Sequence, residues 1–305
     1  MKRLYIYILF LSVCFSAGAT AQMGDVLICG KDTFTLFSNP LRLHPQYKNI
    51  IEQMFWRKSV SGSTACWRGY VAEWRLEKNK LYLSGIAVSF DPKQSDSAAL
   101  AEVVSYDRMR RKKTKVPPLN RSRFFDVGMI YINIEQIFPG QMTKYGVFAS
   151  WVNDTLVVPK GKCVYYIHDG YASVYEKETD LFIENGRLTG SRDFDNSRTR
   201  TSPLLKRGDV SDFIGKNIRW DSIPFLSDKG CRIVVGFSTG GESGKVENIR
   251  ILRSSGEEWF DREAIRVVSL IPGEVIYRRG TYRSMYWTVP VIFSEKTRNK
   301  YCQKK

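Results

Sequence analysis

The strongest constraint on the fold is a residue pattern near the C-terminus. Ile233, Val235 and Phe237 occupy alternate positions, a glycine-rich turn covers 240–244, and a second alternating apolar segment covers 246–252. Alternation with a period of two places one set of side chains on one face of a strand, and the turn lets the second strand pair with the first. This part of the chain is therefore predicted to form a β-hairpin.

A helix is predicted to follow the hairpin. Ser255-Gly256-Glu257-Glu258 has the form of a capping box, in which the Ser255 hydroxyl and the Glu258 carboxylate each accept a hydrogen bond from a backbone N–H. Pro272-Gly273 is expected to end the helix. Between these signals, apolar residues recur at spacings of three and four and so share one helix face: Phe260, Ala264, Val267, Val268 and Ile271.

The last predicted strand is 286–293, and Pro290 predicts its place in the sheet. Trp287, Val289, Val291 and Phe293 alternate along this strand, so they are expected to face the core. Proline has no N–H to donate to a neighbouring strand, and a strand that contains one is expected at a sheet edge.

In order and in residues, positions 210–294 resemble the C-terminal domain of the TonB family. The resemblance implies an α+β domain with a three-stranded antiparallel sheet and helices on one face. It depends on six segments taken together: Phe213–Trp220, Ile233–Ser238, Gly244–Val246, Ile251–Gly256, Asp261–Val268 and Val289–Phe293.

The resemblance also implies a site. Members of the family bind extended peptides of outer-membrane transporters, which add a strand beside the final β-strand. The alternative is an edge strand that is only protected by its proline and covered by the N-terminal region. The implied peptide-binding edge consists of Tyr286, Trp287, Thr288, Val289, Val291, Ile292 and Phe293.

Three departures from the energy-transducing members are predicted. We expect the chain to lack a lasting membrane anchor and a long proline-rich spacer, and the Trp expected near the end of the helix is absent from 272–276. We therefore expect a binding protein without motor coupling, related to TonB-dependent transmembrane transport.

The N-terminus resembles a secretory signal at 1–21. Met1-Lys2-Arg3 is basic, 4–17 is apolar, and Ala19-Thr20-Ala21 offers a cleavage site before Gln22. The apolar run is shorter than the roughly twenty residues of a membrane helix. We expect the protein to be located in the periplasm, either free or associated with the outer membrane. The alternative to a cleaved signal is an uncleaved N-terminal anchor.

The region 22–200 is predicted to be β-rich, followed by a linker at 201–209 and, after the TonB-like domain, a basic tail at 295–305. Three hairpins are expected in this region, at 70–83, 147–158 and 181–188. The first two begin with similar residues, which suggests an internal duplication. The fold class as a whole is predicted to be α+β.

Charge is the second global feature. Lysine and arginine outnumber aspartate and glutamate by 47 to 31, for a net charge of +16. In an exported protein the expected anionic partners are lipid head groups, surface polysaccharide or cell-wall polymer rather than nucleic acid, and the alternative is a basic surface that its charge only keeps soluble. One basic run is expected to be a loop, either a patch for an anionic polymer or a solvated insertion: Arg108, Arg110, Arg111, Lys112, Lys113 and Lys115.

No catalytic arrangement is evident in the sequence. The two histidines, His44 and His168, lack a recognisable nucleophile, and scattered carboxylates such as Asp193 do not define a glycosidase pair. We expect no metal and no cofactor, and a protein that binds envelope proteins without catalysis. The alternative is a hydrolase or binder that acts on an anionic cell-wall or surface polymer through the N-terminal region. Five cysteines follow Gln22, and they allow either one or two disulfides or free thiols.

Overall fold

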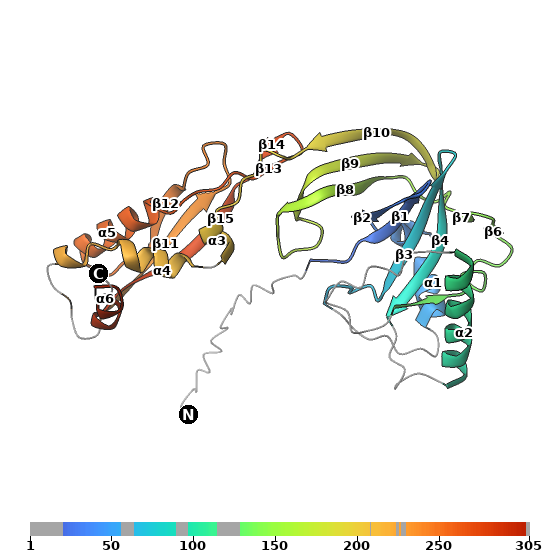
Figure 1. The fold of residues 1–305 in the computed structure, drawn as a ribbon, viewed down its shortest axis with the longest axis horizontal. Helices are drawn as coiled ribbons and strands as arrows, with labels where there is room; N and C mark the ends of the chain where they lie inside the picture. The colour runs from blue at the N-terminus through green and yellow to red at the C-terminus, as the bar shows by residue number, and fades with distance from the viewer. Residues whose placement is uncertain are drawn as a thin grey trace, which may run out of the picture.

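The computed structural model describes residues 21–55, 64–89, 97–114, 129–207, 209–223, 226 and 230–302. The expected signal lies outside these residues except for Ala21, and so does Lys115 of the basic run. The chain forms two lobes, which a strongly curved set of strands and a small hairpin connect (Figure 1). Within the described residues, no helix is both long and apolar enough to cross a membrane.

The N-terminal lobe contains one sheet of ten strands. Its main path runs β2-β1-β3-β4-β10-β9-β8, and β5, β6 and β7 lie off this path against β4. All neighbouring strands are antiparallel except β1 and β3. The strands are β1 (Asp25–Cys29), β2 (Asp32–Leu36), β3 (Tyr70–Glu77), β4 (Lys80–Ser89), β5 (Met129–Ile132), β6 (Met142–Thr143), β7 (Gly146–Phe148), β8 (Asp154–Tyr165), β9 (Val174–Glu184) and β10 (Arg187–Asp195).

Two of the three predicted hairpins are confirmed. β3 pairs with β4 across a turn in which Lys78 and Asn79 have positive φ, and β9 pairs with β10 across Asn185 and Gly186, also at positive φ. Asparagine and glycine tolerate this backbone region better than other residues, which is why the Asn-Gly turn could be recognised.

The second predicted hairpin, at 147–158, is wrong. β7 pairs with β4 and β6, whereas β8 pairs with β9 along its length. The amide of Ala149 donates to the carbonyl of Leu81, so the chain after β7 continues along β4 before it turns away. The segment therefore does not repeat the first hairpin, and the structure lends no support to a duplication.

The core of the N-terminal lobe lies between this sheet and its helices η1 (Pro40–Leu43), α1 (Tyr47–Phe55) and α2 (Ser97–Thr114). Tyr70 and Trp74 of β3 are its largest fully buried side chains. The basic run was expected to be a loop, but its residues up to 114 belong to α2, so that prediction is wrong. Val103 of α2 packs in the core, which fixes this helix against the sheet.

The C-terminal lobe has the predicted three-stranded antiparallel sheet. Its order is β12-β11-β15, and the chain as a whole is α+β, as expected. Buried residues of α4 and α5 share one core with the inward-facing residues of β11 and β15. The elements are α3 (Pro203–Arg207), α4 (Val210–Asn217), η2 (Trp220–Ser222), β11 (Cys231–Thr239), β12 (Glu247–Arg253), α5 (Glu258–Ser269), β15 (Met285–Phe293) and α6 (Glu295–Cys302).

The predicted apolar face of α5 is confirmed, and the predicted capping box is wrong. All five predicted residues are buried in the core, and four of them lie on α5, whereas Ile271 follows the end of the helix at Ser269. The helix begins at Glu258 without a side-chain cap. Instead, the carboxylate of Asp261 accepts hydrogen bonds from the hydroxyls of Ser254 and Ser255 and from the Ser255 amide. The carboxylate of Asp261, one turn into the helix, therefore takes the role that was predicted for Glu258.

The segment between the lobes has more regular structure than expected. β10 continues to Asp195, and the expected linker at 201–209 contains α3, whose Leu205 is buried in the C-terminal core. The backbones of Arg200 and Val275 exchange hydrogen bonds of 2.8 and 2.9 Å. A small hairpin, β13 (Tyr277–Arg278) and β14 (Thr281–Tyr282), follows Val275 and reaches the N-terminal lobe (Figure 1).

Candidate peptide-docking edge

β15 lies at the edge of its sheet. Its nine residues pair with β11 in an unbroken register, from Met285 opposite Thr239 to Phe293 opposite Cys231. No other strand of the described ranges pairs with β15. The edge position predicted from Pro290 is therefore confirmed, and one side of this main chain carries no strand.

The side chains of the predicted edge fall into two groups. Val289, Val291 and Phe293 are buried in the core, so they can contribute only their backbone to docking. Tyr286 and Ile292 are 50% and 45% exposed, and Thr288 is exposed beside them on the outer face. Trp287 is half-buried on the inner face.

Tyr286 is held in place on the outer face. Its hydroxyl lies over the backbone of Gly236, where a Cβ would collide with it. The guanidinium of Arg250 lies 5.4 Å from the centre of the Tyr286 ring, a distance that favours a cation–π interaction. The ring therefore forms a fixed apolar surface beside the exposed Leu252.

A pocket of about 340 Å³ lies at the C-terminal end of β15, between α4 and α6. Ile214, Ile218 and Ile292 line it, with Lys296 on one side. Gly215 has no side chain, which leaves room for the ring of Tyr301 to pack against α4. We call this cavity the α4–α6 pocket.

The charges beside the α4–α6 pocket are arranged around Asp212. Hydrogen bonds from Lys216, and from Tyr301 and Lys300, lower the pKa of this carboxyl to about 2. Asp212 thus forms ion pairs with two lysines, at 2.6 Å from Lys216 and 3.3 Å from Lys300. Both lysines are exposed and the pairs are solvent-screened, so we assign them little stability.

A second pocket, of about 430 Å³, lies where the two lobes meet near the beginning of β15. Tyr165 and Tyr166 of the N-terminal lobe line it together with Leu205, Glu274 and Trp287 of the C-terminal lobe. We call it the inter-lobe pocket. The sequence contains no signal for this pocket, because its walls come from four separate segments and none of them carries a motif.

Hydrogen bonds connect the walls of the inter-lobe pocket. The indole N–H of Trp287 donates to the Thr239 hydroxyl at 2.9 Å, and that hydroxyl donates to Glu274 Oε1 at 2.9 Å. The Tyr165 hydroxyl donates to the same oxygen at 3.0 Å. Burial, together with the neighbouring Glu274 carboxylate, raises the pKa of the Tyr165 hydroxyl, so it stays protonated and remains a donor.

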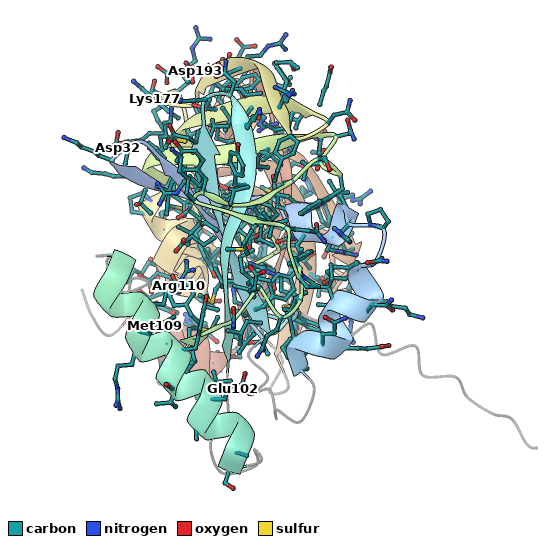
Figure 2. The ribbon with its side chains drawn as sticks, turned by 90° about the vertical axis from the view of Figure 1, so that its right-hand side faces the viewer. Asp32, Glu102, Met109, Arg110, Lys177 and Asp193 are labelled. Carbon is teal, nitrogen blue, oxygen red and sulfur yellow. The ribbon has the colours of Figure 1, made fainter. Side chains whose placement is uncertain are left out.

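The predicted anionic-polymer patch requires a correction, because Arg110 is not on the surface. It is 9% exposed, and its guanidinium forms an ion pair of 2.7 Å with the buried Glu73. The same carboxylate accepts hydrogen bonds from the hydroxyls of Ser84 and Tyr131. Figure 2 shows Arg110 on the side of α2 that faces the sheet.

The other members of that patch are only partly described. Arg108 is exposed on α2. The side chains of Arg111, Lys112 and Lys113 and the whole of Lys115 lie outside the described residues. A patch at this place would therefore consist of these residues without Arg110.

The residues considered for catalysis lie apart. The ring of His168 is exposed and its Nδ1 lies 2.9 Å from the Tyr166 hydroxyl, whereas Asp193 accepts a hydrogen bond from Thr179 on the neighbouring strand. His44 packs against the ring of Trp151 at 4.6 Å, and burial lowers its pKa. The described part of the chain contains no cluster of His, Cys, Asp and Glu that could hold a metal.

No disulfide joins the five cysteines that follow Gln22, all of which lie within the described residues. Cys66 is buried, and Cys163 and Cys302 are exposed, while Cys29 and Cys231 are intermediate. Burial raises the pKa of the Cys66 thiol, and therefore keeps it protonated and unreactive.

Comparisons of the chain with protein-family models, with curated proteins and with solved structures found no match.

Proposed function

We propose that this chain is a non-catalytic binding protein of the bacterial envelope, which works in the periplasm. Its C-terminal lobe docks an extended peptide of an outer-membrane transporter or of another envelope protein, and the peptide adds a strand beside β15. The observation that carries this proposal is that, among the described residues, β15 has a partner strand on one side only, over nine residues in regular register.

The physical basis is the edge position of β15, whose second side pairs with no strand of the described residues. In strand addition, backbone hydrogen bonds provide affinity and side-chain contacts provide specificity. Tyr286, Thr288 and Ile292 are exposed on this strand and are available for such contacts. The α4–α6 pocket and the inter-lobe pocket lie near the two ends of β15, so a bound strand has a cavity near each end.

The resemblance of residues 210–294 to the TonB C-terminal domain supports an outer-membrane transporter as the source of the peptide. We propose that the protein takes part in TonB-dependent transport as a binding partner, without motor coupling of its own. The edge strand and the three-stranded sheet are compatible with this proposal.

Backbone methylation of the peptide provides a direct test. In an extended peptide the N–H groups of alternate residues point to the same side. We compare two peptides, one methylated at the odd-numbered backbone nitrogens and the other at the even-numbered ones, so that each has one blocked edge. The peptide whose blocked edge faces β15 should no longer bind the full chain, since each lost backbone hydrogen bond costs about 1 kcal/mol. The other peptide should still bind.

The measurement is a titration of the full chain with transporter-derived N-terminal peptides, followed by calorimetry and by the backbone amide resonances of 286–293. If the unmethylated peptides bind and both methylated sets bind equally well, docking does not use strand addition. If the unmethylated peptides leave these resonances unchanged, β15 is not the docking site.

A further inference from the structure

Glu274 is a buried carboxylate whose hydrogen-bond partners are both neutral. The residue is 3% exposed, and its Oε1 accepts from the hydroxyls of Tyr165 and Thr239. Among the described residues, no hydrogen bond or ion pair reaches Oε2, and no cationic side chain pairs with Glu274. This differs from the other buried carboxylates in the part of the chain that the structure describes. Asp25, Glu73, Glu178, Asp180 and Glu263 each pair with an arginine.

A carboxylate that leaves water loses solvation free energy, which two neutral hydroxyl donors replace only in part. A cation placed against Oε2 would compensate for the remaining loss of solvation free energy. Glu274 lines the inter-lobe pocket, so a ligand in this cavity can approach it.

The other walls of the inter-lobe pocket also suit a cation. Three aromatic side chains line it, namely Tyr165, Tyr166 and Trp287. The negative face of an aromatic ring attracts a cation, and a desolvated site strengthens this attraction. Tyr166 is 60% exposed, so the cavity has an aromatic residue at its open side.

The free oxygen also distinguishes between types of cation. A guanidinium binds a carboxylate best through two parallel N–H bonds, one to each oxygen. Oε1 of Glu274 already accepts two hydroxyl donors, so only Oε2 remains. An ammonium group is a compact charge that needs one acceptor, and it fits this arrangement better than a guanidinium.

We propose that the inter-lobe pocket binds a primary alkylammonium group, with Glu274 as its counter-ion, and that a lysine side chain of the docked peptide supplies this group. The second part rests on the proposed function. Trp287 joins the two sites, because it belongs to β15 and also lines the pocket. A peptide that pairs with β15 would therefore have its lysine near the beginning of this strand.

The first test uses n-butylammonium as the probe, with n-butanol as its uncharged counterpart. The indole N–H resonance of Trp287 reports binding and is assigned by its loss in Trp287→Phe. Glu274→Gln keeps the shape and the acceptor of the side chain but removes the charge, so affinity for butylammonium should fall about tenfold or more. The matched control is Glu257→Gln, since Glu257 is exposed and makes no side-chain cap hydrogen bond.

A second variant does not depend on the buried network. Tyr166→Ala removes a largely exposed ring, and affinity for butylammonium should fall about two- to fivefold. The backbone amide spectrum of each variant confirms that it is folded.

The second test compares two docking peptides that differ only in lysine or norleucine at one position. The lysine peptide should bind more tightly to the full chain, and Glu274→Gln should remove the difference. If butylammonium does not shift the Trp287 indole, or if Glu274→Gln and Glu257→Gln bind it equally, the ammonium site is refuted, whether or not the peptides bind.

The remaining outcomes separate this proposal from strand addition. If butylammonium binds through Glu274 but both peptides bind equally, the peptide lysine is not the source and that part is overturned, while strand addition stands. If butylammonium binds and neither peptide does, the peptide source is likewise overturned, and strand addition fails with it.

Discussion

At the residue scale, buried charges are held by specific partners. Glu73 and Arg110 lie 2.7 Å apart under α2, and Gly85 leaves the space that the guanidinium occupies. The Arg110 guanidinium also lies 4.3 Å from the centre of the Tyr131 ring. One member of a basic run thus attaches α2 to the sheet, while its neighbour Arg108 stays exposed.

Arg110→Ala is expected to destabilise the protein strongly. Removing one partner of a buried ion pair leaves the other charge unpaired, which typically costs about 3–5 kcal/mol. The control Arg108→Ala, two positions away, should change stability by less than about 0.5 kcal/mol. Urea denaturation followed by circular dichroism measures both. Equal effects of the two variants would show that the pair does not hold α2.

At the element scale, turns fix which strands meet. Gly186 has a φ of +71° in the β9–β10 turn, its amide donates to Val152 and its carbonyl accepts from Leu81. An added Cβ would lie 2.5 Å from the Ala149 carbonyl oxygen. This glycine therefore serves both the turn and its contact with the rest of the sheet.

Gly186→Ala should be more destabilising than Gly140→Ala. Both glycines have positive φ, but no atom lies within 4 Å of a Cβ at Gly140. Gly140→Ala therefore shows the conformational cost alone, about 1–2 kcal/mol. The collision at Gly186 should add roughly 1–3 kcal/mol. Thermal unfolding compares the two variants, and a smaller effect at Gly186 would contradict the assigned contact.

Local patterns predicted some elements well and missed others for a physical reason. The Asn-Gly turn at Asn185 and the alternation in β15 are short-range signals, and both gave correct strands. Besides its neighbour β6, β7 pairs with β4, which lies more than sixty positions earlier, and nothing in 146–158 encodes that distance.

Local patterns likewise predicted only those features of the sites that a single residue determines. Pro290 was sufficient to place β15 at an edge, because its missing N–H is a property of the residue itself. The burial of Arg110 and the inter-lobe pocket around Glu274 depend on contacts between distant segments. Such sites have no local pattern and appear only once the chain is folded.

At the scale of the whole molecule, a cluster of charges connects the lobes. Glu178 on β9 is 1% exposed and forms ion pairs with Arg278 at 2.8 Å and with Arg279 at 2.7 Å. Arg279 also pairs with Asp180 on the same strand. Both arginines lie at the β13–β14 hairpin, which Figure 1 shows between the lobes. The hairpin thus helps to keep the inter-lobe pocket assembled.

Glu178→Gln should loosen this connection without unfolding either core. Amide hydrogen exchange at Arg200, Val275 and Arg279 is expected to accelerate about ten- to a hundredfold, equivalent to roughly 1.4–2.7 kcal/mol. Glu184→Gln is the control, since Glu184 is exposed on the same strand. Unchanged exchange in Glu178→Gln would mean that backbone contacts alone hold the lobes together.

The proposed function depends most on peptide pairing at the edge of β15. Cross-strand nuclear Overhauser effects test this pairing most directly. In a complex of the full chain with a transporter-derived peptide, the account predicts contacts between backbone protons of the peptide and those of Met285–Phe293, repeating at every second residue. A bound peptide whose backbone contacts lie on another element, with none to β15, would contradict it.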